Sequence, residues 1–102
     1  MQLKYKLNKS SLYVYFDGEL DNYSAKSIVK CLDDLINDNV SAKSVIFNLS
    51  ELSFLDSTGL GVILGRYKKL SSLHIPLYIE NPTMQANKLF ELSGVYNIIP
   101  KC

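Results

Sequence analysis

The sequence predicts an α/β fold in which helices pack beside a mixed β-sheet, with elements in the order β-β-α-β-α-β-α-β. Alternating apolar and polar residues at 3–7 and 12–16, around a short turn cluster, predict an antiparallel hairpin. Stretches with helical spacing of apolar residues then alternate with short apolar runs. Such alternation favours parallel strand pairs joined by right-handed crossovers, so the sheet should contain both kinds of pairing.

The first half of the chain should contain one helix between two strands of the sheet. The second strand is expected to end in a loop at 17–21, which carries three carboxylates. A helix is expected over about 24–37. Its apolar stripe consists of Ile28, Val29, Leu32, Leu35 and Ile36. The continuous apolar run at 45–47 is typical of a strand that is central in its sheet or covered on both faces.

The second half should contain two helices and two short strands. A helix is expected from the Ser57 region to about 72. Its stripe consists of Leu60, Ile63, Leu64, Tyr67 and Leu70. A strand at 76–80 and a helix at about 84–92 follow, and Thr83 is a suitable cap for that helix. A final short strand is expected at 95–99.

Length and composition narrow the class of protein. The chain has 102 residues, so we expect residues 1–102 to form one domain. Lys plus Arg number 11 and Asp plus Glu number 10, which disfavours a nucleic-acid-binding protein. No apolar run approaches a membrane span and no signal-peptide core is present, so no membrane association and a cytoplasmic location are expected. The two cysteines lack zinc spacing, and Cys31 is expected to be a small core residue.

The segment 52–69 organises the chain, because a polar cluster stands in it where a helix begins. This cluster is Asp56-Ser57-Thr58-Gly59. A helix N-terminus presents free backbone N–H groups and a partial positive charge, which favour a carboxylate or a phosphate. Ser57 has two interpretations: an N-cap worth about 1 kcal/mol, or a hydroxyl that is modified or reactive. The local pattern leaves both open.

This segment lacks the residues that the enzyme motifs it resembles would need. The nucleophile elbow needs Gly-x-Ser-x-Gly, and Leu55 stands two residues before Ser57. The only histidine, His74, should lie at the far end of the same helix, so no base can activate the hydroxyl. Gly61 and Gly65 fall inside the helical stripe, so they imitate a dinucleotide fingerprint only in spacing and are expected to allow close helix packing. No P-loop or metal-ligand cluster occurs, so no cofactor is expected.

A family resemblance rests on three motifs that occur in order along nearly the whole chain. The segment from Leu52 to Lys68 closely resembles the signature of STAS-domain anti-sigma factor antagonists, most of all those of sporulation. Gly18-Glu19-Leu20-Asp21 is similar to the first loop motif of that family, and Leu92-Ser93-Gly94-Val95 to its last. The resemblance implies a STAS-like fold, with a mixed sheet and helices beside it.

The same resemblance implies a switch protein without catalytic residues of its own. Ser57 matches the phosphoacceptor of the family. The partner-binding residues implied are Gly18, Glu19, Asp21, Asp56, Ser57, Thr58 and Gly59. The unphosphorylated protein would bind an anti-sigma factor that is also a serine kinase, and so release a sporulation sigma factor; a PP2C-type phosphatase would reverse the modification. Two alternatives remain: an antagonist in the general stress response, and a STAS module that acts as a scaffold or binds a ligand.

Overall fold

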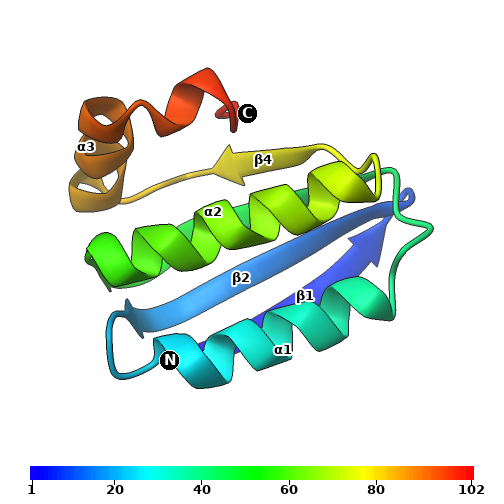
Figure 1. The fold of residues 1–102 in the computed structure, drawn as a ribbon, viewed down its shortest axis with the longest axis horizontal. Helices are drawn as coiled ribbons and strands as arrows, with labels where there is room; N and C mark the ends of the chain where they lie inside the picture. The colour runs from blue at the N-terminus through cyan, green and yellow to red at the C-terminus, as the bar shows by residue number, and fades with distance from the viewer.

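Four strands form one mixed sheet in the computed structural model, which describes residues 1–102 (Figure 1). The elements are β1 (Gln2–Asn8), β2 (Ser11–Leu20), α1 (Ala25–Asn37), β3 (Ser44–Leu55), α2 (Ser57–Ser72), β4 (Leu77–Glu80), α3 (Met84–Ser93) and a short 3-10 helix, η1 (Val95–Asn97). The spatial order of the strands is β1-β2-β3-β4. β1 is antiparallel to β2, whereas β2 with β3 and β3 with β4 are parallel. The predicted mixed sheet is therefore confirmed.

Most of the core lies between the sheet and the two longer helices, and Phe90, Val95 and Ile99 extend it to α3 and η1. Figure 1 shows α1 and α2 side by side on one face of the sheet, with α3 and η1 beside β4. Phe16 of β2 and Phe47 of β3 are fully buried, and their ring centroids are 5.0 Å apart in an edge-to-face contact. α1 and α2 are also joined by an ion pair of 3.2 Å between Arg66 Nε and Asp33 Oδ1. This packing fixes where α2 begins relative to the strands.

Both strands that end beside the N-terminus of α2 are longer than predicted. The predicted loop at 17–21 belongs mostly to β2, which continues to Leu20, and β3 runs to Leu55 rather than ending after Phe47. Parallel pairing continues through two register irregularities, one after Tyr15 and one after Gly18. These irregularities interrupt strict alternation of apolar and polar residues, so the pattern alone indicated a loop.

The predicted last strand at 95–99 is wrong. Gly94 ends α3 with a φ of +79°, and the chain continues into η1. Val95 and Ile99 are both buried, and the Ile99 N–H donates to the Val95 carbonyl over 2.8 Å. A spacing of four residues puts two side chains on one side of a helical turn, so this apolar run packs as a turn and not as a strand. Only an isolated parallel bridge joins Lys101 to Ile79 of β4.

Other sequence-based expectations concern single residues and function classes. Cys31 is exposed, contrary to the expectation of a core residue, because Ile28 and Leu32 take the buried side of α1. No group of three or more His, Cys, Asp or Glu side chains is placed to hold a metal ion. None of the helices combines the length and the apolar character needed to cross a bilayer.

Candidate functional site

Asp56 caps the helix that carries the polar cluster. It is extended, with φ −110° and ψ −173°, and its Oδ1 accepts a hydrogen bond of 2.8 Å from the Gly59 N–H. The alternative that Ser57 is the cap is therefore wrong. Ser57 and Thr58 are the first two residues of α2 and are exposed. Their hydroxyls stand at the end of the helix where backbone N–H groups lack intrahelical partners.

Gly59 lies where α2 touches the end of β2. It is buried, and a Cβ added there would be 2.2 Å from the Leu20 carbonyl oxygen and 2.7 Å from Leu55 Cδ1. Cβ atoms added at Gly61 or Gly65 would meet nothing within 4 Å. The expectation that Gly61 and Gly65 allow close packing is therefore wrong, and Gly59 has that role. Because Leu20 stands between Glu19 and Asp21, this contact brings the Gly18–Asp21 motif to the start of α2.

Hydrogen bonds fix the connection between β2 and α1. The Asp21 carboxylate accepts from the backbone N–H groups of Tyr23, at 2.9 Å, and Ser24, at 3.0 Å. The Ser24 hydroxyl accepts from the Asp21 N–H at 3.0 Å and donates to the Glu19 carbonyl at 2.8 Å. The Ser24 and Tyr23 N–H groups hold the pKa of Asp21 below its usual value, so this carboxylate is ionised at neutral pH. Sequence analysis predicted a loop at 17–21 and a partner-binding role for Asp21, but none of these hydrogen bonds.

Glu19 and Gly18 lie on β2, just before this connection. Glu19 is exposed and pairs across the sheet with Phe54. Gly18 has a φ of +118°, which side chains rarely allow, and a Cβ there would be 3.2 Å from the Met1 Cα. Gly18 therefore shapes the strand beside one of its register irregularities. All the residues predicted to bind a partner thus lie at the ends of β2 and β3 or in the first turn of α2.

Gln85 is a residue of this site that sequence analysis missed. Its Oε1 accepts from the Leu55 N–H at 3.1 Å, and its Nε2 donates to the Leu55 carbonyl at 2.8 Å. β4 pairs with β3 only from Val45 to Asn48, so Gln85 takes the place of a strand partner further along. It thereby ties the first turn of α3 to the residue before Asp56. No local pattern signals this contact, which joins positions 30 apart in the chain.

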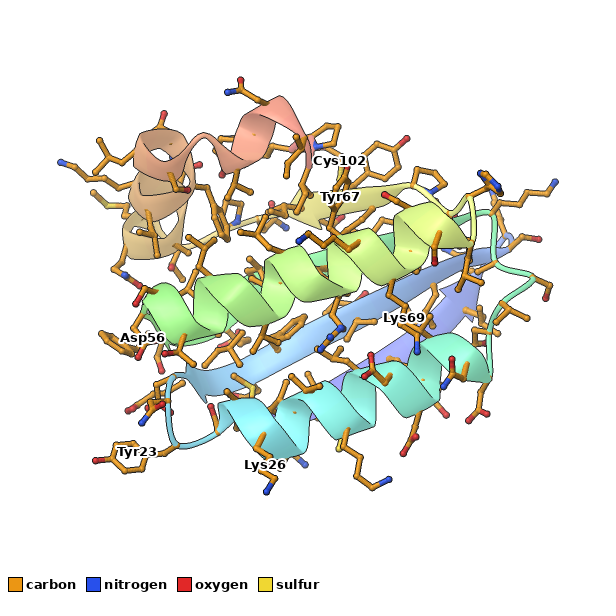
Figure 2. The ribbon with its side chains drawn as sticks, viewed as in Figure 1. Tyr23, Lys26, Asp56, Tyr67, Lys69 and Cys102 are labelled. Atoms are coloured by element: carbon orange, nitrogen blue, oxygen red, sulfur yellow. The ribbon has the colours of Figure 1, made fainter.

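The site therefore offers an accessible serine hydroxyl among fixed carboxylates at a helix N-terminus. In Figure 2, Asp56 and Tyr23 lie at the same end of the molecule, where α2 begins. His74 follows the other end of α2, a helix of 16 residues that spans about 24 Å. No imidazole is thus near Ser57 to act as a general base. This geometry suits a hydroxyl that another protein modifies better than a nucleophile in its own right.

Comparisons with known proteins agree with the motifs. Residues 2–102 match the STAS domain family. The chain is 29% identical to an anti-sigma F factor antagonist of Paenibacillus polymyxa over 100 residues, covering 98% of this chain and 85% of that protein. It is 32% identical to an anti-sigma-B factor antagonist of Bacillus subtilis over 94 residues, covering 92% and 84%.

Solved structures show the same fold. The unphosphorylated form of the anti-sigma factor antagonist SpoIIAA superposes with a TM-score of 0.80 at 24% identity, over 99% of this chain and 88% of that chain. Its phosphorylated form gives 0.73 at 24% identity, over 99% and 91%. The family match and the sequence relatives place the chain in the STAS-domain family, among its anti-sigma factor antagonists.

Proposed function

We propose that residues 1–102 act as a single STAS domain in the cytoplasm, where the unphosphorylated form binds an anti-sigma factor that is also a serine kinase. Binding releases the sigma factor of sporulation. Phosphorylation of Ser57 by the same partner ends the interaction, and a PP2C-type phosphatase restores it. ATP and magnesium belong to the kinase, because this chain has no P-loop to hold them.

The observation that carries this proposal is the exposed Ser57 in the first turn of α2, with Asp56 taking the cap. Since Ser57 is not needed as a cap, its hydroxyl is free for modification without loss of the helix. Phosphate adds about −1.5 to −2 charges at pH 7. A helix N-terminus stabilises nearby negative charge by about 0.3–1 kcal/mol. The modified chain should therefore stay folded, which a reversible switch requires.

The phosphate would act on the partner in two ways. It adds negative charge to an end that already carries Glu19, Asp21 and Asp56, so the electrostatic complementarity between this end and a basic partner changes. It also fills space directly beside Ser57. Charge and bulk can be separated by substitution, as described below.

A second candidate differs in the sigma factor served. The Bacillus subtilis relative at 32% identity is named an anti-sigma-B factor antagonist. This favours a general-stress sigma factor as the alternative to the sporulation factor. Purified anti-sigma F-type and anti-sigma B-type factors from the organism that carries this chain would distinguish the two, because only the cognate factor should release its sigma factor when this protein is added.

The main experiment incubates the protein with each of these anti-sigma factors and ATP, and locates phosphate by mass spectrometry. One phosphate on Ser57 is expected, with none on the Ser57→Ala variant and normal modification of Thr58→Ala. Phosphate only on Thr58, or on neither residue with either factor, would refute the proposal.

Substitutions of Ser57 then test the switch itself. Ser57→Ala should bind the partner and resist switching, while Ser57→Asp should bind it weakly. Ser57→Asn has the shape of Asp without its charge and is the matched control. If Ser57→Asp loses binding and Ser57→Asn keeps it, the effect is due to charge. An equal loss of binding in the two variants shows that it is due to bulk. The free energies of unfolding of all three variants should lie within about 1 kcal/mol of that of wild type, because an exposed first-turn position tolerates these side chains. Unfolding of Ser57→Asp would show that Ser57 is structural.

A further inference from the structure

Two apolar side chains that are almost fully exposed to solvent lie at the end of the molecule where α2 begins. Ten large apolar side chains are exposed in this protein, and the two most exposed are Tyr23, at 93%, and Met84, at 91%. Single exposed apolar residues are common on protein surfaces and need no explanation. Here, however, the two most exposed residues are 61 positions apart in the sequence, in segments that the fold brings to one end (Figure 1).

Both side chains are carried on segments tied to the strand ends beside Ser57. The Tyr23 N–H donates to the Asp21 carboxylate, and Asp21 follows Leu20, whose carbonyl lies against Gly59. Met84 precedes Gln85, whose two hydrogen bonds hold the Leu55 backbone. The backbones at Tyr23 and Met84 are thus fixed on either side of the segment that carries Ser57. Figure 2 shows the Tyr23 ring projecting away from the ribbon into solvent.

Exposed apolar side chains on a fixed backbone are well suited to bind a partner. Ordering a side chain on binding costs free energy, and a rigid support reduces that cost. Tyr is enriched among the residues that dominate interface energetics, and Met packs adaptably into apolar pockets. The same end carries the carboxylates of Glu19, Asp21 and Asp56, so a complementary surface has basic side chains near its apolar pockets.

We infer that Tyr23 and Met84 are the apolar anchors by which this protein binds its anti-sigma factor, one on each side of Ser57. The inference rests on the proposed function and specifies the partner surface: two apolar pockets flanked by Lys or Arg, with the Ser57 hydroxyl between them. A phosphate on Ser57 then lies at the centre of the contact, where it reduces the affinity for the partner most.

The test measures affinity for the anti-sigma factor that phosphorylates Ser57, by calorimetry without ATP, for Tyr23→Ala, Met84→Ala and Tyr23→Phe. Leu92→Ala is the matched control, because Leu92 is 78% exposed on α3 but stands near its other end. Tyr23→Ala and Met84→Ala should each bind at least about tenfold more weakly. Tyr23→Phe and Leu92→Ala should bind like wild type, and thermal melts of all four should match it.

Two results overturn the inference alone: affinities of Tyr23→Ala and Met84→Ala within about twofold of a wild type that binds, or an equal loss in Leu92→Ala. A wild-type protein that binds neither anti-sigma factor overturns the proposed function as well. The two failures are therefore distinguishable in one titration series.

Discussion

Gly59→Ala tests the contact that brings the predicted site residues together. The new Cβ would be 2.2 Å from the Leu20 carbonyl oxygen, and this gap has to open to at least 3.0 Å. The obstructing atom belongs to the backbone of β2, so it cannot move aside like the end of a flexible side chain. Overpacking of this kind costs about 1–3 kcal/mol and sometimes more, against about 1 kcal/mol gained from helix propensity. Because the clash is with backbone, the upper end of that cost applies, and we expect a net loss of about 2 kcal/mol.

Two glycines of the same helix provide matched controls. A Cβ at Gly61 or Gly65 meets nothing within 4 Å. Gly61→Ala and Gly65→Ala should therefore gain most of the helix-propensity term, about 0.5–1 kcal/mol each. The same chemical change should thus have opposite signs within seven residues of one helix. This contrast removes effects of the unfolded chain, which the three substitutions share.

Urea unfolding monitored by circular dichroism would measure the three free energies of unfolding. A domain of this size loses about 1–3 kcal/mol per molar urea, so Gly59→Ala should lower the midpoint by about 1 M. Its melting temperature should fall by roughly 10 °C. If Gly59→Ala is as stable as Gly65→Ala, the close approach of α2 to β2 is not rigid, and the positioning of Leu20 beside Gly59 is not what holds the site together.

Three further predictions concern the supports of the site. Asp56→Ala removes the helix cap and should lose about 1 kcal/mol of stability, whereas Ser57→Ala should lose less than about 0.5 kcal/mol. A larger loss in Ser57→Ala than in Asp56→Ala, measured by urea unfolding, would show that Ser57 is the cap. Gln85→Ala should cost about 1–2 kcal/mol, since two hydrogen bonds to the Leu55 backbone are lost, and faster amide exchange at Leu55 should accompany it; unchanged exchange there would contradict the contact. Asp21 has a lowered pKa in the folded state, so its contribution is complete above the unfolded pKa of about 3.9 and is lost as pH falls through the folded pKa. The urea midpoint of Asp21→Asn should therefore fall less than that of wild type as the pH is lowered below about 4, and parallel curves would exclude this carboxylate as the cause.

The sequence by itself determined the elements whose signal is local. Helical spacing placed α1, α2 and α3 within a few residues of their ends, and alternation found the β1–β2 hairpin. These patterns follow from burying one side of a helix or strand, which depends on residues a few positions apart. Thr83 also caps α3 as expected, with its Oγ1 accepting from the Ala86 N–H. The segment around Ser57 was likewise recognisable, because its motif is continuous in the chain.

Only the tertiary structure decided how that segment is held. Asp56 and Ser57 are both suitable caps, and the choice depends on β3 continuing to Leu55, where Gln85 supports it from α3. α2 contains three glycines, and only packing on β2 shows that Gly59 is the one without room for a side chain. At the C-terminal end, an apolar run became η1 because Gly94 turned the chain beforehand. Each of these outcomes depends on contacts between distant parts of the chain, and local sequence patterns do not predict the free energy of such contacts.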